Sequence, residues 1–364
     1  MVHPTKLVNS LRTDSAFPGV ATLERERGRP YKARLGSNEC LFGTSPDAFQ
    51  AAEAAKETLA YYNDPACFDL IQAIGRSEDL DPESILVDVG IDGLLGLFVR
   101  GFLEPGSAAI TTRGSYPTFN YHVRGYGGRL VEIPYEESFH TGLNGMRDAA
   151  HSNQARVCYV SNPDNPTGTF LPKQELAQFI NEIPDDCLIL LDEAYIEFVP
   201  GSLVLPMDFT RPNLVRLRTF SKAYGLASAR VGYAICDPAI VRAMNRIRLH
   251  FGVGALSQIM ARAVLDDRAF LAGVIAATEE GKSDLETIAR ALSIDCIPSY
   301  ANFIALDFET PERAKKVAAV LEEFDIFVRR PPELDTGRLI RVTIGPKPLR
   351  EIFSSALQEA VQRA

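Results

Sequence analysis

The chain has 364 residues, a length that accommodates two domains. Its composition, 46% hydrophobic and 23% charged, is that of an ordinary globular protein. The formal net charge of -9 argues against a general nucleic-acid binder, because such proteins usually present a basic surface.

The sequence also lacks signals for membranes, secretion and metals. No window approaches the roughly 20 uninterrupted apolar residues of a membrane-spanning helix, and the N-terminal segment has no apolar core of a secretory signal. The cysteines are scattered singly, with no C-x-x-C pair, and the histidines show no H-x-x-x-H spacing. We therefore expect a cytoplasmic protein with reduced thiols, no metal centre and no nucleic-acid or membrane partner.

The first predicted elements are an arm and a group of helices. Residues 1–30 are mixed and polar, with a turn at Pro18-Gly19, and are predicted to form an N-terminal arm. The alanine-rich stretch within residues 45–80 predicts helices. From residue 85 onward, short apolar runs alternate with helical stretches, one ending near residue 102 and one beginning near 117. The apolar runs lie at 85–90, 108–112, 129–135, 156–162, 187–194 and 214–220.

Apolar runs of this kind, alternating with helices, are typical of a buried and mostly parallel sheet. After about residue 240 the pattern changes. A long helical region at 238–292 is followed by strands near 296–306, a helix at 311–324 and strands at 326–330 and 339–345. The expected organisation is therefore an arm at 1–30, a large α/β domain at 31–245 and a smaller α+β domain at 246–364.

Four of the apolar runs end in unusual polar clusters. These clusters read VDVGIDG, VSNPDNPTG, LLDEAYIEF and TFSKAYGLASAR. Taken singly, each can be loop chemistry, since Asn-Pro and Pro-Thr-Gly make turns and Asp-Glu can cap a helix. Ligands of open α/β sheets, however, bind beyond the carboxyl ends of the strands. The ordered occurrence of all four clusters therefore points to one binding site.

The residue types in these clusters suit a pyridine-aldehyde cofactor that carries a phosphate. Such a cofactor needs a lysine with a lowered pKa to form an imine, and an acid to keep the ring nitrogen protonated. Its phenolic oxygen needs hydrogen-bond donors, and its phosphate needs a helix N-terminus with hydroxyl and cationic partners. The sequence offers Lys222 for the imine, Asp192 for the ring nitrogen, Tyr195 and Asn165 as donors, and Ser221 and Arg230 for the phosphate.

The motifs NPDNPTG, DEAY, SKAYGLASARVGY and RVTIG resemble those of fold-type I aminotransferases, most closely the histidinol-phosphate aminotransferase branch. The resemblance runs from about residue 30 to 350. It implies the aspartate aminotransferase-like fold, with pyridoxal 5'-phosphate bound to the large domain. It also implies a role in amino-acid biosynthesis.

The resemblance assigns roles to individual residues. Lys222 would carry the cofactor, and Asp192 and Tyr195 would act with it in catalysis. The cofactor would also be bound by the side chains of Asn165, Ser221 and Arg230, by the amides of Ile91 and Asp92, and by Tyr116 of GSYPTF stacking on the ring. Tyr62 of YYNDP resembles a tyrosine that reaches the cofactor phosphate of the neighbouring subunit, which implies a homodimer with shared active sites.

Two arginines near the C-terminal end are candidates for substrate binding. Most arginines are solvated, but Arg341 lies within an apolar strand pattern, where an unpaired guanidinium would be costly. A planar guanidinium suits a carboxylate or a phosphate. The resemblance places the substrate's anion on Arg341, with help from Arg329 and Asn165; Arg330 is adjacent and could be confused with Arg329. The expected reaction is transamination between an amino donor, histidinol phosphate or another anionic or aromatic amino acid, and a 2-oxo acid such as 2-oxoglutarate.

Several positions depart from the family's pattern, and all of them concern the loops near the substrate or the cofactor phosphate. The family's N-E-N-P-Y-G is NECLFG at 38–43, and Phe17 stands where a tyrosine is usual. Gly93 replaces an acidic residue, and ELDTGRL precedes Arg341. These departures leave the cofactor residues intact but weaken the assignment of one substrate.

Three other functions are alternatives to transamination. A decarboxylase of the threonine-phosphate type would have nearly the same cofactor residues. A regulatory protein on this scaffold would carry an added DNA-binding segment, for which the arm leaves no room. A nicotinamide dehydrogenase would show G-x-G-x-x-G after a strand, and no such motif occurs.

Overall fold

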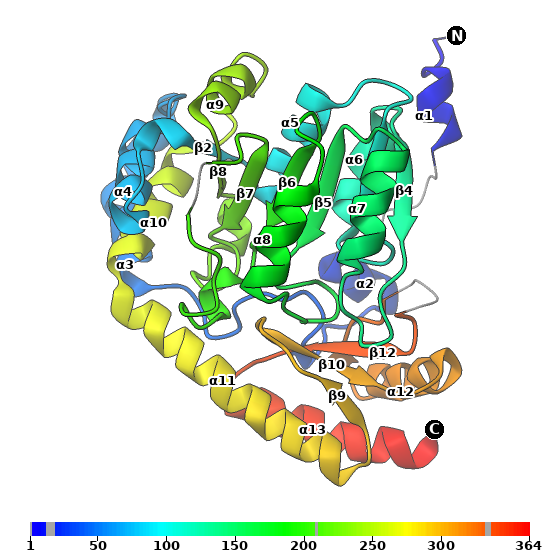
Figure 1. The fold of residues 1–364 in the computed structure, drawn as a ribbon. Helices are drawn as coiled ribbons and strands as arrows, with labels where there is room; N and C mark the ends of the chain where they lie inside the picture. The colour runs from blue at the N-terminus through cyan, green and yellow to red at the C-terminus, as the bar shows by residue number, and fades with distance from the viewer. Residues whose placement is uncertain (1, 12–18, 208–209, 332–335) are drawn as a thin grey trace.

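The computed structural model describes residues 2–11, 19–207, 210–331 and 336–364. One lobe is built around a large sheet covered by helices, and a second lobe is built around two small sheets. The long helix α11 (Arg268–Ala291) runs from the edge of the first lobe along the second (Figure 1).

The large sheet has seven strands in the order β2-β8-β7-β6-β5-β3-β4. Strands β3 to β7 run parallel to one another, whereas β8 is antiparallel to both of its neighbours, β2 and β7. Strand β8 has no counterpart among the predicted elements. The bounds are β2 (Ile85–Asp88), β3 (Ala108–Thr112), β4 (Arg129–Ile133), β5 (Val157–Ser161), β6 (Leu188–Asp192), β7 (Leu214–Thr219) and β8 (Gly232–Ile235).

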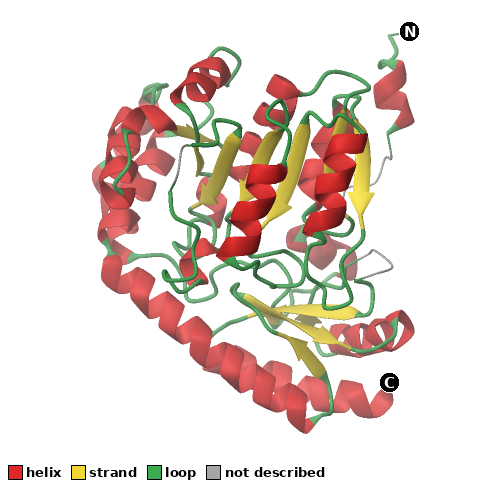
Figure 2. Cartoon of the chain, viewed as in Figure 1, coloured by secondary structure: helices red, strands yellow, loops and turns green. Residues whose placement is uncertain are grey.

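Helices cover both faces of this sheet, which explains why its strands are apolar at nearly every position. In β6, Ile189 and Leu191 pack with α7 (Leu143–Ser152) and α8 (Lys173–Glu182). The alternate residues of β6 pack with α5 (Gly90–Phe102) and α6 (Pro117–Gly125) on the other face. Figure 2 shows α7 and α8 in front of the sheet. The predicted α/β fold with a mostly parallel sheet is confirmed.

The second lobe contains the small sheets and the last helices. Strands β12, β10 and β9 form an antiparallel sheet, and β1 pairs in parallel with β11. Apolar residues of these strands and of α11, α12 and α13 share one core. The bounds are β1 (Ala33–Arg34), β9 (Asp295–Ile297), β10 (Phe303–Asp307), β11 (Ile326–Phe327), β12 (Leu339–Thr343), α12 (Pro311–Glu323) and α13 (Lys347–Arg363).

The remaining helices lie mostly at the edge of the large sheet. The long helical region predicted at 238–292 is divided into three helices, α9, α10 and α11, with a break at 246–254. Within the described ranges, no helix is both long enough and apolar enough to cross a membrane. The other bounds are α3 (Pro46–Ala54), η1 (Lys56–Ala60), α4 (Phe68–Glu78), η2 (Pro82–Ser84), η3 (Ile196–Phe198), η4 (Ala227–Ala229), α9 (Pro238–Asn245) and α10 (Ala255–Asp266).

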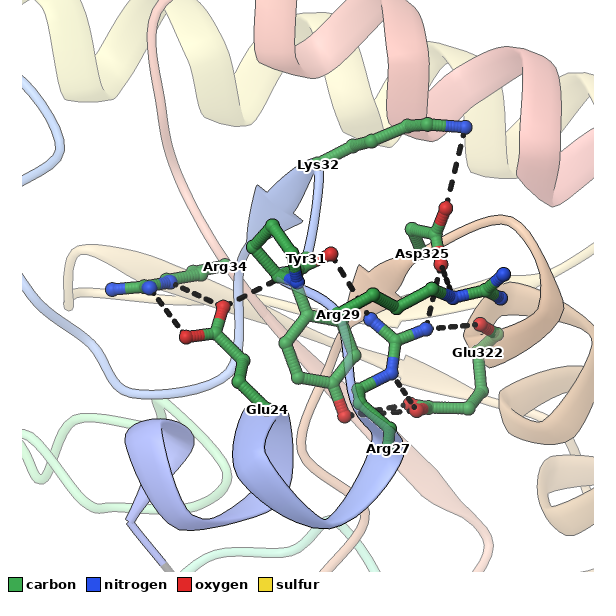
Figure 3. Close-up of polar contacts among 9 residues, drawn as sticks. Glu24, Arg27, Arg29, Tyr31, Lys32, Arg34, Glu322 and Asp325 are labelled. Atoms are coloured by element: carbon green, nitrogen blue, oxygen red, sulfur yellow. Dashed lines mark hydrogen bonds and ion pairs between the residues drawn. The ribbon is translucent and has the colours of Figure 1, made fainter.

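The N-terminal segment contains two helices, α1 (Lys6–Ser10) and α2 (Val20–Arg27). Helix α2 buries no side chain, and ionic contacts hold its end against the second lobe (Figure 3). Nη2 of Arg27 lies 2.6 Å from Oδ1 of Asp325, and its Nε lies 3.2 Å from Oε1 of Glu322. The sequence-based range 31–245 assigns β1 to the large domain, whereas the strand partner of β1 lies in the second lobe.

Candidate active site

A cavity of about 310 Å³ lies between the carboxyl ends of β5, β6 and β7, the start of α5, and the second lobe. Its size falls in the usual range for small-molecule sites. Nearly all of the predicted site residues line it, although they come from segments up to 250 positions apart. The predicted residues in its wall are Ile91, Asp92, Tyr116, Asn165, Asp192, Tyr195, Ser221, Lys222, Arg230, Arg329 and Arg341.

The parallel strands bring the polar clusters together. Asp192 is the last residue of β6 and pairs with Ser161 at the end of β5. Thr219 ends the neighbouring strand β7, three residues before Lys222. Because these strands run in the same direction, their polar ends meet at one edge of the sheet.

Lys222 lies at the base of the cavity. Its Nζ donates a hydrogen bond to the carbonyl oxygen of Asn38 at 3.0 Å and lies 5.6 Å from the centre of the Tyr195 ring. Burial, together with the positive charge of Arg341, lowers the pKa of Lys222 to about 8. The neutral, nucleophilic amine is therefore accessible close to neutral pH.

Asp192 is almost fully buried, at 3% exposure. Its carboxylate accepts hydrogen bonds from the Tyr159 hydroxyl at 2.7 Å and from the Ala194 amide at 3.0 Å. Burial nevertheless raises the pKa of Asp192 to about 6. A cation next to this carboxylate would lower the pKa again, so the site favours a positively charged partner.

Arg341 and Asn165 also line the cavity and contact each other. Nη1 of Arg341 donates to Oδ1 of Asn165, and Nη2 donates to the carbonyl oxygen of Gly36 at 2.7 Å. Arg341 is 7% exposed, and burial lowers its pKa to about 10. Its Nε has no hydrogen-bond partner among the described residues. A buried guanidinium that keeps an unused donor among the described residues is suited to a bound anion.

The other end of the cavity has the features of an anion site. Helix α5 begins at Gly90, and no side chain caps its first turn, which contains Ile91 and Asp92. The guanidinium of Arg230 faces this turn, with Nη2 3.2 Å from a carboxylate oxygen of Asp92, and Nη1 lies 3.4 Å from Oγ of Ser221. Free amides at a helix N-terminus, a hydroxyl and a guanidinium are the groups that bind phosphate.

Gly90 gives this end of the cavity its shape. It has a φ of +75°, and a Cβ at this position would lie 2.7 Å from Nη2 of Arg230. A side chain would therefore fill the space in which the helix amides and Arg230 approach each other. The open space at Gly90 and the uncapped amides of α5 suit the phosphate of a cofactor such as pyridoxal phosphate, and the buried carboxylate of Asp192 suits a cationic ring.

Sequence reasoning gave no role to several residues of the site. Nδ2 of Asn38 donates to the Tyr195 hydroxyl at 3.0 Å, and Glu39 and Thr219 also line the cavity. Burial raises the pKa of Tyr195 to about 12, so its hydroxyl keeps its proton near neutral pH. Asn38 has an unusual backbone conformation, with a φ of +55°. Its contact with Tyr195 spans 157 positions, so no local sequence pattern could reveal it.

Some predicted residues lie elsewhere. Tyr62 does not line the cavity of this chain; it is 86% exposed, and its ring lies 4.9 Å from that of Phe251. Phe17 falls outside the described residues. Packing explains the glycine at position 93, because a Cβ there would lie 2.4 Å from Cγ2 of Val89. Of the two adjacent arginines, Arg329 lines the cavity and Arg330 is not among its lining residues.

A metal site is not apparent in the described parts of the chain. No group of three or more His, Cys, Asp or Glu side chains there is arranged to hold an ion. The described cysteines are all free thiols, most of them buried.

Comparison with known proteins agrees with this geometry. Residues 31–357 match the family described as aminotransferase class I and II. A crystal structure of histidinol-phosphate aminotransferase from Sinorhizobium meliloti in complex with pyridoxal-5'-phosphate is 36% identical, with a TM-score of 0.95 over 100% of this chain and 98% of that chain. Histidinol-phosphate aminotransferase 2 of Carboxydothermus hydrogenoformans is 36% identical over 330 residues, which are 90% of each chain. The histidinol-phosphate aminotransferase of Moorella thermoacetica is 33% identical over 345 residues, 93% of this chain and 88% of the relative. The chain thus belongs to the aminotransferase class I and II family, has the aspartate aminotransferase fold, and is a pyridoxal-phosphate-dependent aminotransferase.

Proposed function

We propose that this enzyme transfers an amino group between histidinol phosphate and 2-oxoglutarate. The observation that carries the proposal is the common cavity of Lys222, Asp192 and Arg341, in which the lysine interacts electrostatically with both the acid and the cation. The relatives at 33% and 36% identity are named for histidinol phosphate, which supports this amino donor. Transamination with 2-oxoglutarate follows the family resemblance.

The proposed cofactor roles follow from the contacts of each side chain. When bound, pyridoxal phosphate supplies an electron-accepting ring that stabilises negative charge on the substrate carbon. Asp192 would hold the ring nitrogen in its cationic form, and a cation there would offset the cost of the buried carboxylate. Tyr195 and Asn165 would donate to the ring oxygen. The Tyr116 ring would cover the cofactor ring, since it lines the cavity and its hydroxyl donates to Asp92 at 2.7 Å.

The phosphate end would be held by the first turn of α5 together with Ser221 and Arg230. The amides of Ile91 and Asp92 supply donors, and Arg230 supplies a positive charge. The carboxylate of Asp92 also lies near the phosphate end, but it is engaged by Tyr116 and Arg230. The amides of Ile91 and Asp92, which no side chain caps, would then donate to the phosphate.

Lys222 would move the proton. Its lowered pKa makes the neutral amine accessible, so Nζ can take the proton from the substrate carbon and deliver it to the cofactor side. Asn38 is a suitable acceptor for the amine, because its carbonyl oxygen already accepts from Nζ at 3.0 Å. This proton transfer is the step in which the lysine acts as an acid and a base.

Arg341 and Arg329 would select the substrate by its anion. Their backbones pair across an isolated bridge, so both guanidinium groups originate from one edge of the second lobe. Burial lowers the pKa of Arg329 as well as that of Arg341, which marks both as poorly solvated cations. A phosphate on histidinol or a carboxylate on 2-oxoglutarate could each be bound there.

We also propose a cytoplasmic homodimer in which Tyr62 reaches the cofactor phosphate of the partner. Tyr62 is too exposed to serve its own cavity. Its ring contacts Phe251, and the segments 59–68 and 247–251 carry several large exposed apolar side chains, a concentration that suits a subunit interface. The exposed members are Leu59, Tyr61, Tyr62, Phe68, Ile247, Leu249 and Phe251.

The dimer can be tested by sedimentation and cofactor titration. We expect a mass of twice 40.0 kDa. We expect Tyr62→Phe to weaken pyridoxal phosphate binding while leaving this mass unchanged. A monomeric wild-type enzyme with full activity would refute the shared site.

The reaction can be tested by a half-reaction screen. Purified enzyme loaded with cofactor is mixed separately with histidinol phosphate, glutamate and threonine phosphate, and the visible spectrum is followed together with keto product and carbon dioxide. We expect histidinol phosphate and glutamate to bleach the visible band and to yield keto products. Release of carbon dioxide without keto product would favour the decarboxylase instead.

A further inference from the structure

Asp92 is held by helix α6 at two different atoms. Its carboxylate accepts from the hydroxyl of Tyr116, the residue that precedes α6, at 2.7 Å. Its backbone carbonyl oxygen lies 3.0 Å from Nε2 of His122, which belongs to α6 itself. Since Asp92 is in the first turn of α5, both contacts fix the start of α5 relative to α6.

The contact with His122 depends on a glycine one turn further along α5. A Cβ at Gly96 would lie 2.7 Å from Cε1 of His122 and 3.0 Å from its Nδ1. Glycine has a low helix propensity, so a buried glycine in the middle of α5 needs a packing reason. The imidazole ring lies against the backbone of α5 because this side chain is missing.

The chemistry of the contact fixes its direction. A carbonyl oxygen only accepts, so Nε2 of His122 carries the proton and donates it. Burial of the ring lowers the pKa of His122, which favours the neutral form with a single N–H. The ring therefore acts as a hydrogen-bond donor of fixed orientation.

We propose that His122 is a positioning residue for the cofactor phosphate. Through the carbonyl of Asp92 it sets the first turn of α5 at a fixed distance from Tyr116, so that the helix amides and the stacking ring meet the same cofactor. The proposal rests on the cofactor site proposed above. It assigns His122 no contact with the cofactor and no proton transfer.

Two replacements of His122 separate the hydrogen bond from the shape of the ring. His122→Phe keeps a flat ring without a donor, and His122→Gln keeps a donor that can reach the same carbonyl. Full-length protein is freed of cofactor and titrated with pyridoxal phosphate. Loss of one hydrogen bond should weaken binding about fivefold in the Phe variant, and the Gln variant should bind within about twofold of wild type.

Gly96→Ala tests the same contact from the other side. The new Cβ displaces the ring, so we expect weaker binding, again about fivefold. In a His122→Ala background the Cβ meets no ring, and Gly96→Ala should have no further effect on binding. Gly125→Ala in α6 is the matched control, because a Cβ there has no neighbour within 4 Å.

The outcomes distinguish the two proposals. If wild-type protein does not bind pyridoxal phosphate, the proposed cofactor site is wrong. If wild type binds but the Phe, Gln and Gly96→Ala variants bind equally well and only melt at lower temperature, His122 is a packing residue and this inference fails. An equal loss from Gly96→Ala with and without His122 would also overturn it.

Discussion

The two ends of the cavity differ in how the chain builds them. The cofactor end is made from the start of α5 and the turns after β5, β6 and β7, which one parallel sheet holds in place. The substrate end combines residues 19–20, residues 36–39, Arg329 and Arg341, which come from the N-terminal segment and the second lobe. Side-chain contacts such as Arg341 with Asn165 and Asn38 with Tyr195 join it to the cofactor end.

This difference indicates which residues of the site are positioned by the sheet and which depend on side-chain contacts. Residues at strand ends are placed by the backbone, so we expect the cofactor end to tolerate change in the surrounding loops. The substrate end depends on contacts between distant segments, and it includes the departure NECLFG at 38–43, whereas Gly93 is a departure at the cofactor end. Variants of the two ends should therefore fail in different ways, in turnover at one end and in substrate affinity at the other.

The largest effect is expected at the cofactor end, from Asp192→Asn. Loss of the carboxylate removes the charge that would hold the ring nitrogen cationic, so we expect kcat to fall on the order of 10²–10³-fold with the fold retained. Tyr159→Phe is the control, since it removes a hydrogen bond to Asp192 but leaves the charge. Steady-state kinetics and circular dichroism measure both effects, and near-normal turnover of Asp192→Asn would refute its role.

At the substrate end, Arg341→Leu should act on affinity. Removal of a charge-assisted contact to an anion should raise KM for histidinol phosphate roughly 10–100-fold, with a smaller change in kcat. Arg330→Leu serves as the control, because Arg330 is close in sequence but is not a lining residue. An unchanged KM in Arg341→Leu would make this arginine a structural residue only.

The sequence predicted residues at both ends of the cavity but missed Asn38, and the reason is physical. Lys222, Asp192 and Asn165 stand at fixed offsets from strands that are recognisable as apolar runs. Asn38 gave no such signal, because its role depends on a contact across 157 positions. The secondary structure elements were likewise predicted where a local sequence pattern marks them.

The elements with long apolar runs were predicted, and the irregular ones were not. Strand β8 is short and begins at a glycine, and the break between α9 and α10 lies inside a region with continuous helical character. The pairing of β1 with β11 joins segments almost 300 positions apart, which no local pattern can reveal. The domain limits at 31–245 and 246–364 remain a prediction.

A smaller effect is expected from Gly90→Ala at the phosphate end. Glycine at positive φ is replaced at a cost of about 1 kcal/mol, and the new Cβ would also crowd Arg230. Gly106→Ala is the matched control, because Gly106 has a φ of +86° but no neighbour within 4 Å. Both variants should melt at a lower temperature, while only Gly90→Ala should weaken pyridoxal phosphate binding, by about fivefold to tenfold. Equal affinities in the two variants would contradict the phosphate assignment.

The smallest effect concerns the pH dependence of Lys222. Since its pKa in the folded protein is about 8 and its ordinary value is 10.5, attachment of the cofactor to protein freed of it should speed up with pH and level off above 8. Between pH 8 and 10.5 the Lys222 amine is protonated in the unfolded state but largely neutral in the folded protein. The free energy of unfolding should therefore rise with pH across this range. Arg341→Leu should move the midpoint of attachment upward, because it removes a nearby positive charge. Stopped-flow absorbance gives the midpoint, and a plateau near pH 10 in the wild type would show an ordinary lysine.

The most direct test of the cofactor end is a mass spectrum of the protein loaded with pyridoxal phosphate and then reduced with borohydride. We expect a single modified peptide that carries the cofactor on Lys222, and no modification at that peptide in Lys222→Ala. A cofactor found on another lysine, or an unmodified Lys222 in protein that shows the visible band, would contradict the proposed site.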